Sequence, residues 1–198
     1  MMTFKKLENE IRLICENYTD EKIGGWITGV GPIPCDVMLI GEAPGKSEVE
    51  LGIPFVGMAG KNLDNYLEVI GLKRSSIRIS NTCYFRPIKT KEGKNDKITI
   101  SNRTPKTSEV ELFREILNQE IKLVNPKIII TLGNIPLRRL TSYKSIGECH
   151  GKLLYNEFLN KKIFAMYHPS ALTYNRNETF ISMYMNDWLI LKEALKSI

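Results

Sequence analysis

Three short segments of the chain contain side chains that could bind or cleave a polar substrate. Glu42 and Glu48 belong to a glycine-rich stretch, Asn81 follows an alternating apolar run, and His168 precedes a proline. Carboxylates orient water or accept protons, and imidazole exchanges protons near neutral pH. An asparagine amide offers a donor and an acceptor, so it can pair with an imide-like base. The combination indicates a site for a hydrogen-bonding substrate.

Each of these segments also has a plainer interpretation. Asn81 could cap a turn at a strand end, and a histidine such as His168 is commonly structural. The stretch Gly41-Glu-Ala-Pro-Gly-Lys-Ser47 is similar to a phosphate-binding P-loop, which follows a strand and ends in Gly-Lys-Ser. A P-loop has four residues between its glycines, however, and here three separate Gly41 from Gly45. Pro44 also removes an amide donor, so nucleotide binding is not predicted.

The elements that must position these residues alternate between strands and helices. Apolar, β-branched or alternating runs predict strands at 36–40, 77–80, 127–132 and 163–167. Helical periodicity predicts helices at 2–17, 59–71, 104–124 and 178–196. Strands separated by helices imply a parallel sheet covered on both faces, and ligands of such sheets bind beyond the carboxyl ends of the strands. We therefore predict a single α/β domain over residues 1–198, with its site at that edge.

The composition favours a soluble protein with a polyanionic partner. The 198 residues include 28 Lys and Arg against 22 Asp and Glu, which gives a formal charge of +6 and a pI near 9.1. Many proteins without such a partner carry a similar surplus. No apolar run reaches the roughly 20 residues of a membrane span, and the first residues lack a secretory signal. We expect a cytoplasmic monomer that does not contact membranes.

Six motifs follow one another in an order found in one enzyme family. They are GEAPG at 41–45, PFVG at 54–57, N-x-x-x-x-RP at 81–87, NRTP at 102–105, PKIIITLG at 126–133 and HPS at 168–170. Together they resemble the family 4 uracil-DNA glycosylases, and the resemblance covers residues 36–196. It implies a three-layer α/β/α sandwich with a central four-stranded parallel sheet. It also implies a monofunctional DNA repair hydrolase that cleaves the N-glycosidic bond of flipped-out uracil and leaves an abasic site.

The resemblance assigns a role to individual residues. Glu42 would position water and support the developing sugar cation, and His168 would donate to O2 of the departing uracil. Glu48 would lie against C5 and exclude the methyl group of thymine, Phe55 would stack on the base, and Asn81 would pair with O4 and N3. The implied uracil pocket comprises Gly41, Ala43, Glu48, Phe55 and Asn81. The residues implied to contact DNA are Arg86, Asn102, Arg103, Ser170 and Leu172.

The chain departs from this family at the position of a cofactor. Family members typically hold a [4Fe–4S] cluster on four cysteines, whereas this chain keeps Cys15 and has Tyr18, Phe85 and Phe113 at the other three positions. The remaining cysteines are scattered and form no CxxC pair. A cluster ligated in the family manner is therefore not expected, and neither is another cofactor or metal. The two phenylalanines suggest an apolar plug in the same space.

A second departure is a basic insertion at about 88–101, between two motifs that are nearly adjacent in the family pattern. It carries Lys89, Lys91, Lys94 and Lys97 against two acidic residues. It is either an added loop that contacts the DNA backbone or a mobile, solvated segment.

The expected partner is uracil-containing DNA, single- or double-stranded. Two alternatives stay open. One is a nucleic-acid-binding member of the superfamily with little or no turnover. The other is a glycosylase for a different deaminated base, such as hypoxanthine or xanthine.

Overall fold

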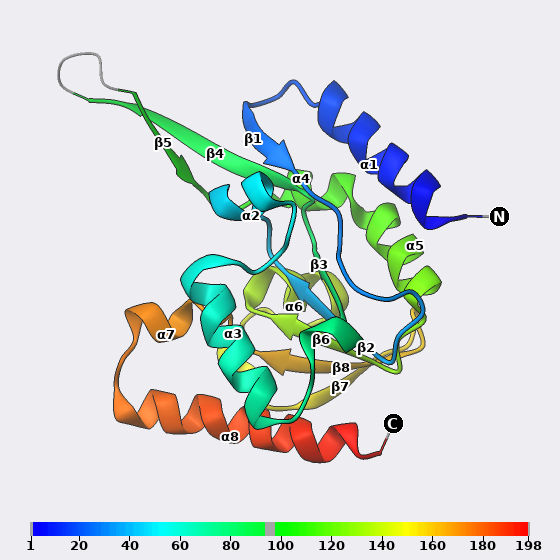
Figure 1. Ribbon diagram of the computed structural model, residues 1–198, viewed down its shortest axis with the longest axis vertical. Coiled ribbons are helices and arrows are strands. Elements are labelled where there is room, and N and C mark those ends of the chain that lie inside the picture. Colours follow the sequence, from blue (N-terminus) through cyan, green and yellow to red (C-terminus); the bar gives the residue numbers. More distant parts are fainter. Residues whose placement is uncertain (1, 94–97, 198) are drawn as a thin grey trace.

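Four parallel strands form the centre of the computed structural model, which describes residues 2–93 and 98–197 (Figure 1). They are β2 (Val37–Gly41), β3 (Arg78–Asn81), β6 (Ile128–Leu132) and β8 (Lys161–Met166), and all four predicted strands are confirmed to within two residues. The strand order is β3-β2-β6-β8-β7, with β7 (Leu153–Asn156) antiparallel to β8. The sheet thus has five strands in the described residues, rather than the expected four. The edge strand β7 is short and its Leu153 and Tyr155 are exposed, so its sequence lacks the apolar run of a buried strand.

The longer helices agree with the helical periodicity, with one correction. Three of the predicted helices are α1 (Phe4–Asn17), α3 (Gly57–Val69) and α8 (Glu178–Leu195). The helix predicted over 104–124 is instead two helices, α4 (Thr107–Leu112) and α5 (Arg114–Val124). Between them, the backbone of Phe113 (φ −100°, ψ 10°) leaves the helical range while its ring is fully buried, so tertiary packing overrides the local pattern. Short helices that no pattern predicted are α2 (Lys46–Leu51), α6 (Asn134–Leu140), α7 (Ala171–Tyr174) and the 3₁₀ turns Arg74–Ser76 and Ile146–Glu148.

Alternate residues of the central strands face two different helical layers. Leu39 and Ile130 pack in one core cluster with residues of α3 and α8. Their chain neighbours Ile40 and Ile129 pack on the opposite face with residues of α5 and α6. Both faces of the strands are therefore apolar, which explains their continuous apolar sequences. The expected three-layer arrangement is confirmed, and Figure 1 shows α3 and α8 together on one side of the sheet. No described helix is both long and apolar enough to cross a bilayer.

A second, antiparallel sheet has the order β1-β4-β5, and its strands are β1 (Ile23–Trp26), β4 (Phe85–Glu92) and β5 (Ile98–Asn102). The pairing of β1 with β4 ends at Pro87. Beyond that point β4 and β5 continue as a two-stranded ribbon that extends away from the body of the molecule (Figure 1). This ribbon contains the predicted insertion, whose described part is therefore β-structure. Lys94 and Lys97 of the insertion lie outside the described residues.

Candidate active site

The carboxyl ends of β2 and β3 bring a glycine, an amide and an aromatic ring together. Gly41 and Asn81 are register partners at these ends. A Cβ atom added to Gly41 would lie 2.6 Å from Oδ1 of Asn81 and 2.6 Å from Cζ of Phe55. Only glycine fits here, because its neighbours already fill the space of a side chain. Three residues predicted for one pocket therefore lie in contact.

Phe55 has a backbone conformation that bulky residues rarely adopt. Its φ is +54° and its side chain is buried. Arg74 holds the segment, because its guanidinium donates hydrogen bonds to the carbonyl oxygens of Pro54 and Phe55, the latter at 2.9 Å. Such strain is costly and is found mainly where a side-chain position has a function. The Phe55 ring centroid lies 5.5 Å from that of His168, at an interplanar angle of 34°.

His168 follows β8 and presents a neutral donor. The backbone N–H of Ser170 donates to Nδ1 of His168 at 3.2 Å, and the Ser170 hydroxyl lies 2.7 Å from the same nitrogen. Because Nδ1 accepts from an amide, the neutral ring carries its hydrogen on Nε2. Burial lowers the pKa of His168 to about 4, so the ring is neutral at pH 7. In the described part of the chain, Nε2–H has no hydrogen-bond acceptor.

Glu42 and Glu48 are carboxyl groups with raised pKa values. Burial raises the pKa of Glu42, and a hydrogen bond from the Thr104 side chain opposes that shift. Burial also raises the pKa of Glu48, against backbone hydrogen bonds that include those of Gly45 and Phe55. Glu48 is thus tied to the segment that carries the Phe55 ring. A carboxylate with a raised pKa, such as Glu42, is a stronger base than an exposed one.

A cleft of about 680 Å³ opens beside these groups, a volume typical of a ligand site. The predicted site residues that line it are Glu42, Ala43, Asn102, Arg103, His168 and Ser170. Phe55, Asn81 and Glu48 are not part of its lining. His168 connects the two groups, because it lines the cleft and lies beside the ring of Phe55.

The cleft also includes residues that were not predicted as site residues. Thr104, Asn134, Tyr167 and Tyr174 contribute to its lining. Asn134 follows β6, so the strand-end rule could have found it. Thr104 stands within the NRTP motif, but its hydrogen bond to Glu42 required the structure. Tyr174 ends α7 with its side chain 87% exposed, and no sequence signal identifies it.

Arg103, predicted to contact DNA, is engaged within the protein. Its guanidinium forms ion pairs at 2.5 Å with Glu109, which is fully buried, and at 2.5 Å with Glu21. The hydrogen bond with Glu109 raises the pKa of Arg103 further. These pairs fix the NRTP segment to the chain before β1. Contact between Arg103 and DNA stays a prediction.

Other predicted DNA contacts differ in their exposure. Arg86 donates from Nε to Oδ1 of Asn102 at 2.6 Å, and Arg86 is mostly buried. Asn102 is exposed and lines the cleft. Leu172 is half-buried and packs against the core, whereas Tyr174 two residues later is exposed. Contact of DNA with Arg86, Asn102, Ser170 and Leu172 stays a prediction.

The four positions at which the family holds its iron–sulfur ligands form a group of mostly apolar side chains against α1, which we call the apolar cluster. Ring centroids lie 4.8 Å apart for Tyr18 and Phe85 and 5.5 Å apart for Phe85 and Phe113. Cys15 is buried with them, and burial raises the pKa of its thiol to about 12. Thiolates ligate iron–sulfur clusters and aromatic rings do not, so these residues do not fit a [4Fe–4S] cluster held in the family manner. No three His, Cys, Asp or Glu side chains among residues 2–93 and 98–197 are grouped to hold a metal ion.

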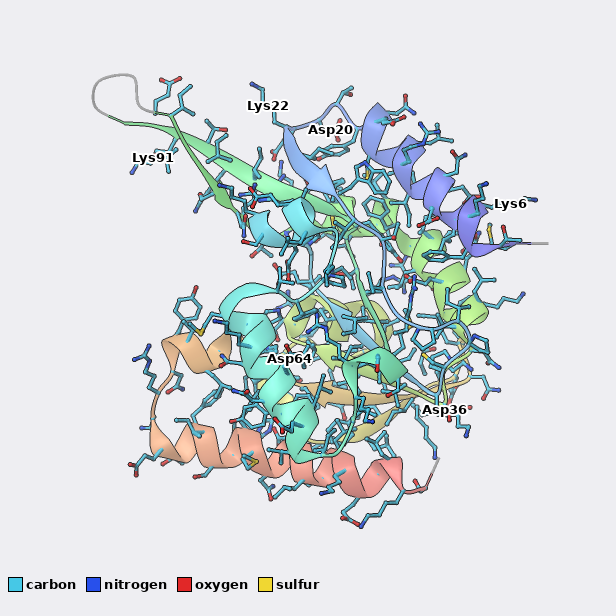
Figure 2. All side chains as sticks on the ribbon, in the orientation of Figure 1. Lys6, Asp20, Lys22, Asp36, Asp64 and Lys91 are labelled. Carbon is cyan, nitrogen blue, oxygen red and sulfur yellow. The ribbon has the colours of Figure 1, made fainter. Side chains whose placement is uncertain are left out.

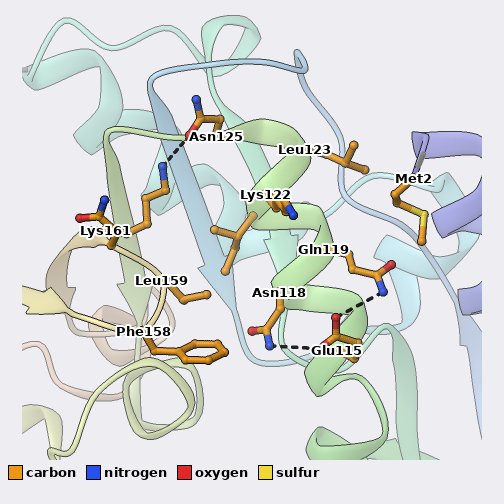
Figure 3. A pocket seen from close by; sticks show the side chains of 12 residues that line it. Met2, Glu115, Asn118, Gln119, Lys122, Leu123, Asn125, Phe158, Leu159 and Lys161 are labelled. Atoms are coloured by element: carbon orange, nitrogen blue, oxygen red, sulfur yellow. Dashed lines mark hydrogen bonds between the residues drawn. The ribbon is translucent and has the colours of Figure 1, made fainter.

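A larger cavity of about 1070 Å³ lies between α5 and the turn before β8 (Figure 3). Polar side chains of its lining form hydrogen bonds with one another. Glu115 accepts from Asn118 and Gln119, and Lys161 donates to Asn125. None of the predicted site residues lines it. Size alone would favour this cavity as the site. The smaller cleft, however, is lined by residues that follow the strand ends, so the cleft is the candidate site.

The mostly parallel sheet is covered on both faces, and an aromatic ring, an amide and a neutral imidazole follow the carboxyl ends of its strands. This is the architecture of an α/β protein whose site lies at that edge of the sheet. The chain belongs to the uracil-DNA glycosylase superfamily, because the family model described as "Uracil DNA glycosylase superfamily" matches residues 28–190.

Individual relatives agree with this membership. The chain is 35% identical to a type-4 uracil-DNA glycosylase of Saccharolobus solfataricus, over 86% of this chain and 76% of that protein. It is 34% identical to one of Sulfurisphaera tokodaii, over 76% and 67%. It is 30% identical to one of Thermotoga maritima, over 86% and 83%.

Proposed function

We propose that this protein is a DNA repair enzyme that hydrolyses the N-glycosidic bond of uracil in DNA and leaves an abasic site. The observation that carries the proposal is the contact of Phe55 and Asn81 with the buried Gly41, together with the His168 ring beside that of Phe55. Membership of the superfamily supports it, as does similarity to proteins named type-4 uracil-DNA glycosylases.

Three side chains recognise the base in this proposal. Uracil inside a duplex is out of reach, so the nucleotide must turn out of the stack, at a cost of a few kcal/mol. The ring of Phe55 then stacks on the base, and the amide of Asn81 donates to O4 and accepts from N3–H. Asn81 has no side-chain hydrogen bond among the described residues, so both its donor and its acceptor are available. Backbone hydrogen bonds hold Glu48 beside Phe55, and in this proposal its side chain lies against C5 of the base and excludes the methyl group of thymine.

Two groups act on the bond. The C1′–N1 bond breaks with its electron pair moving onto uracil, which leaves an oxocarbenium-like sugar. Glu42 orients a water molecule toward C1′ and accepts its proton, and the raised pKa of Glu42 suits this role. His168 donates from Nε2 to O2 of the departing uracil anion. Because the pKa of His168 is lowered to about 4, the ring performs this task in its neutral form.

We infer that apolar packing replaces the family's iron–sulfur cluster in this chain. Tyr18, Phe85 and Phe113 pack ring against ring where thiolates would be needed, and the thiol of Cys15 has a raised pKa. Tilted and edge-on ring pairs beside α1 supply the contacts that an iron–sulfur cluster would otherwise supply. The residues proposed for recognition and hydrolysis lie outside this apolar cluster.

The test is a cleavage assay on labelled oligonucleotides that contain one uracil, either single-stranded or opposite G or A. EDTA is present throughout, and alkali cleaves any abasic site. We expect strand cleavage only after alkali and no iron in the purified protein. Salt-sensitive binding without cleavage would contradict the proposal and favour a binding protein, and cleavage at hypoxanthine or xanthine instead would reassign the base.

A matched pair of variants tests the reading of the base. Asn81→Asp replaces the donor of the amide with an acceptor, so uracil release should fall about 10²-fold or more. Asn9→Asp makes the same change on the exposed surface of α1 and should leave the rate unaltered. Equal rates for the two variants would remove Asn81 from base recognition.

A further inference from the structure

The β4–β5 ribbon has a basic face. In an antiparallel ribbon, register partners point to the same face and successive residues alternate between faces. Lys89 pairs with Ser101 and Lys91 pairs with Thr99, so two ammonium groups and two hydroxyl groups share one face. All four are hydrogen-bond donors suited to phosphate oxygens.

The opposite face of the ribbon has a different character. Thr90 pairs with Ile100 and Glu92 pairs with Ile98. The isoleucine side chains are 55% and 61% exposed, respectively. The only acidic side chain among these described positions, Glu92, therefore points away from the two lysines. The ribbon thus presents its positive charge on one side.

The basic face begins at the cleft. Lys89 contributes to the lining of the cleft, and Tyr174 contributes from α7. Figure 2 shows Lys91 farther out along the ribbon. Two residues along a β-strand span about 7 Å. The phosphates of one DNA strand follow one another every 3.4 Å along the helix axis, so this span corresponds to about two of them. The lysine spacing therefore matches a nucleic-acid backbone that leaves the cleft.

We propose that the Lys89–Lys91 face binds the phosphate backbone of the duplex beside the turned-out nucleotide, so that this ribbon favours double-stranded over single-stranded DNA. The inference rests on the proposed function only for the placement of the nucleotide. Duplex DNA is stiff over about 150 base pairs, so it holds its flanking phosphates at a fixed distance from the cleft. A single strand must first be ordered to reach the ribbon.

The experiment compares two variants that lose the same charge. Lys89→Gln/Lys91→Gln alters the ribbon, and Lys5→Gln/Lys6→Gln alters exposed residues of α1; Figure 2 places Lys6 and Lys91 on opposite sides of the molecule. Binding to a uracil-free duplex is measured by fluorescence anisotropy from about 50 to 200 mM NaCl. Each phosphate contact contributes about −0.9 to the slope of log K against log salt. The ribbon variant should therefore lose about 1.8 from the magnitude of the slope, and the α1 variant should lose none.

Three results would overturn the inference. The first is an unchanged slope for the ribbon variant, and the second is an equal loss of slope for the α1 variant. The third is an equal loss on a single strand of the same sequence, which would refute the preference for duplex. Because the DNA contains no uracil, binding gives an answer even when the protein releases no base. Failure of the ribbon proposal and failure of the proposed function are therefore distinguishable.

Discussion

The strand-end corner at Gly41 and the apolar cluster against α1 are both buried, but they differ in unused hydrogen-bonding capacity. At the corner, the amide of Asn81 and Nε2 of His168 have no partner in the described part of the chain. In the apolar cluster, the one polar ring is satisfied, because the Tyr18 hydroxyl donates to Glu109 at 2.8 Å. Neither the Asn81 amide nor Nε2 of His168 is among the fully buried polar atoms that lack a partner, so each is open to a ligand that reaches it. The corner therefore has the properties of a site that a substrate completes, and the apolar cluster has the properties of a structural core.

The two regions also differ in how closely their residues follow the family pattern. Gly41, Phe55, Asn81 and His168 stand within the family's motifs, and they meet at the corner. The positions at which thiols are replaced meet in the apolar cluster. The proposed reacting groups and the apolar cluster thus lie in different parts of the core, and Ala43 of the cleft packs against the apolar cluster. The proposed loss of a cofactor from one region need not alter the other.

The strongest test of this separation is Phe113→Ala. Truncating a fully buried phenylalanine removes apolar contacts and leaves a cavity, so the free energy of unfolding should fall by about 3–5 kcal/mol. Chemical denaturation measures the loss, and uracil release is measured where the variant is still folded, with kcat expected within a few-fold of the parent protein. Phe158→Ala is the control, because that ring is 86% exposed and its loss should cost less than about 0.5 kcal/mol.

If Phe113→Ala does not fold, Phe113→Leu is measured instead, because leucine keeps most of the buried volume. A folded variant of Phe113 with a severely lowered kcat would show that the apolar cluster participates in the chemistry. The functional difference between the two regions would then be refuted.

A smaller effect, on activity alone, is expected for His168→Ala. Loss of the donor to the departing uracil should lower kcat by about 10²–10³-fold while DNA affinity stays nearly intact. Single-turnover uracil release and anisotropy binding measure the two quantities separately. Ser170→Ala removes only one of the two groups at Nδ1, so its loss of kcat should be much smaller. Equal turnover of His168→Ala and the parent protein would remove this histidine from the mechanism.

The smallest effect expected is a shift of the pH profile in Thr104→Val. The Thr104 hydrogen bond favours the ionised form of Glu42 and so lowers its pKa. Losing the bond therefore raises that pKa. Because Glu42 must be ionised to accept a proton, the acidic limb of kcat moves to higher pH by the same amount. Protonation of His168 does not set this limb, since its pKa is lowered to about 4.

The Thr104 experiment measures kcat against pH for the parent protein, Thr104→Val and Thr107→Val. Thr107 is exposed at the start of α4 and gives the same change of side chain nearby. An acidic limb that stays in place in Thr104→Val, or moves equally in both variants, would separate Thr104 from the titration of Glu42.

Local sequence was enough to predict the parallel strands and the edge of the sheet at which the site lies. Strands buried on both faces must be apolar throughout, so β2 and β6 are visible as runs of local sequence. Topology then places their carboxyl ends at one edge, where Gly41, Asn81 and His168 follow. The motifs supplied the pairing of these residues with Phe55. None of these inferences required a distance.

Tertiary structure alone decided what depends on contacts between distant segments. The ion pair of Arg103 with Glu21 joins residues 82 positions apart, and the break of the helix at Phe113 follows from packing against Phe85. The neutral state of His168 follows from burial. The strand register of the β4–β5 ribbon places its described lysines on one face and its isoleucines on the other. The lysine-rich sequence does not specify this register, and a shift of one residue exchanges the faces.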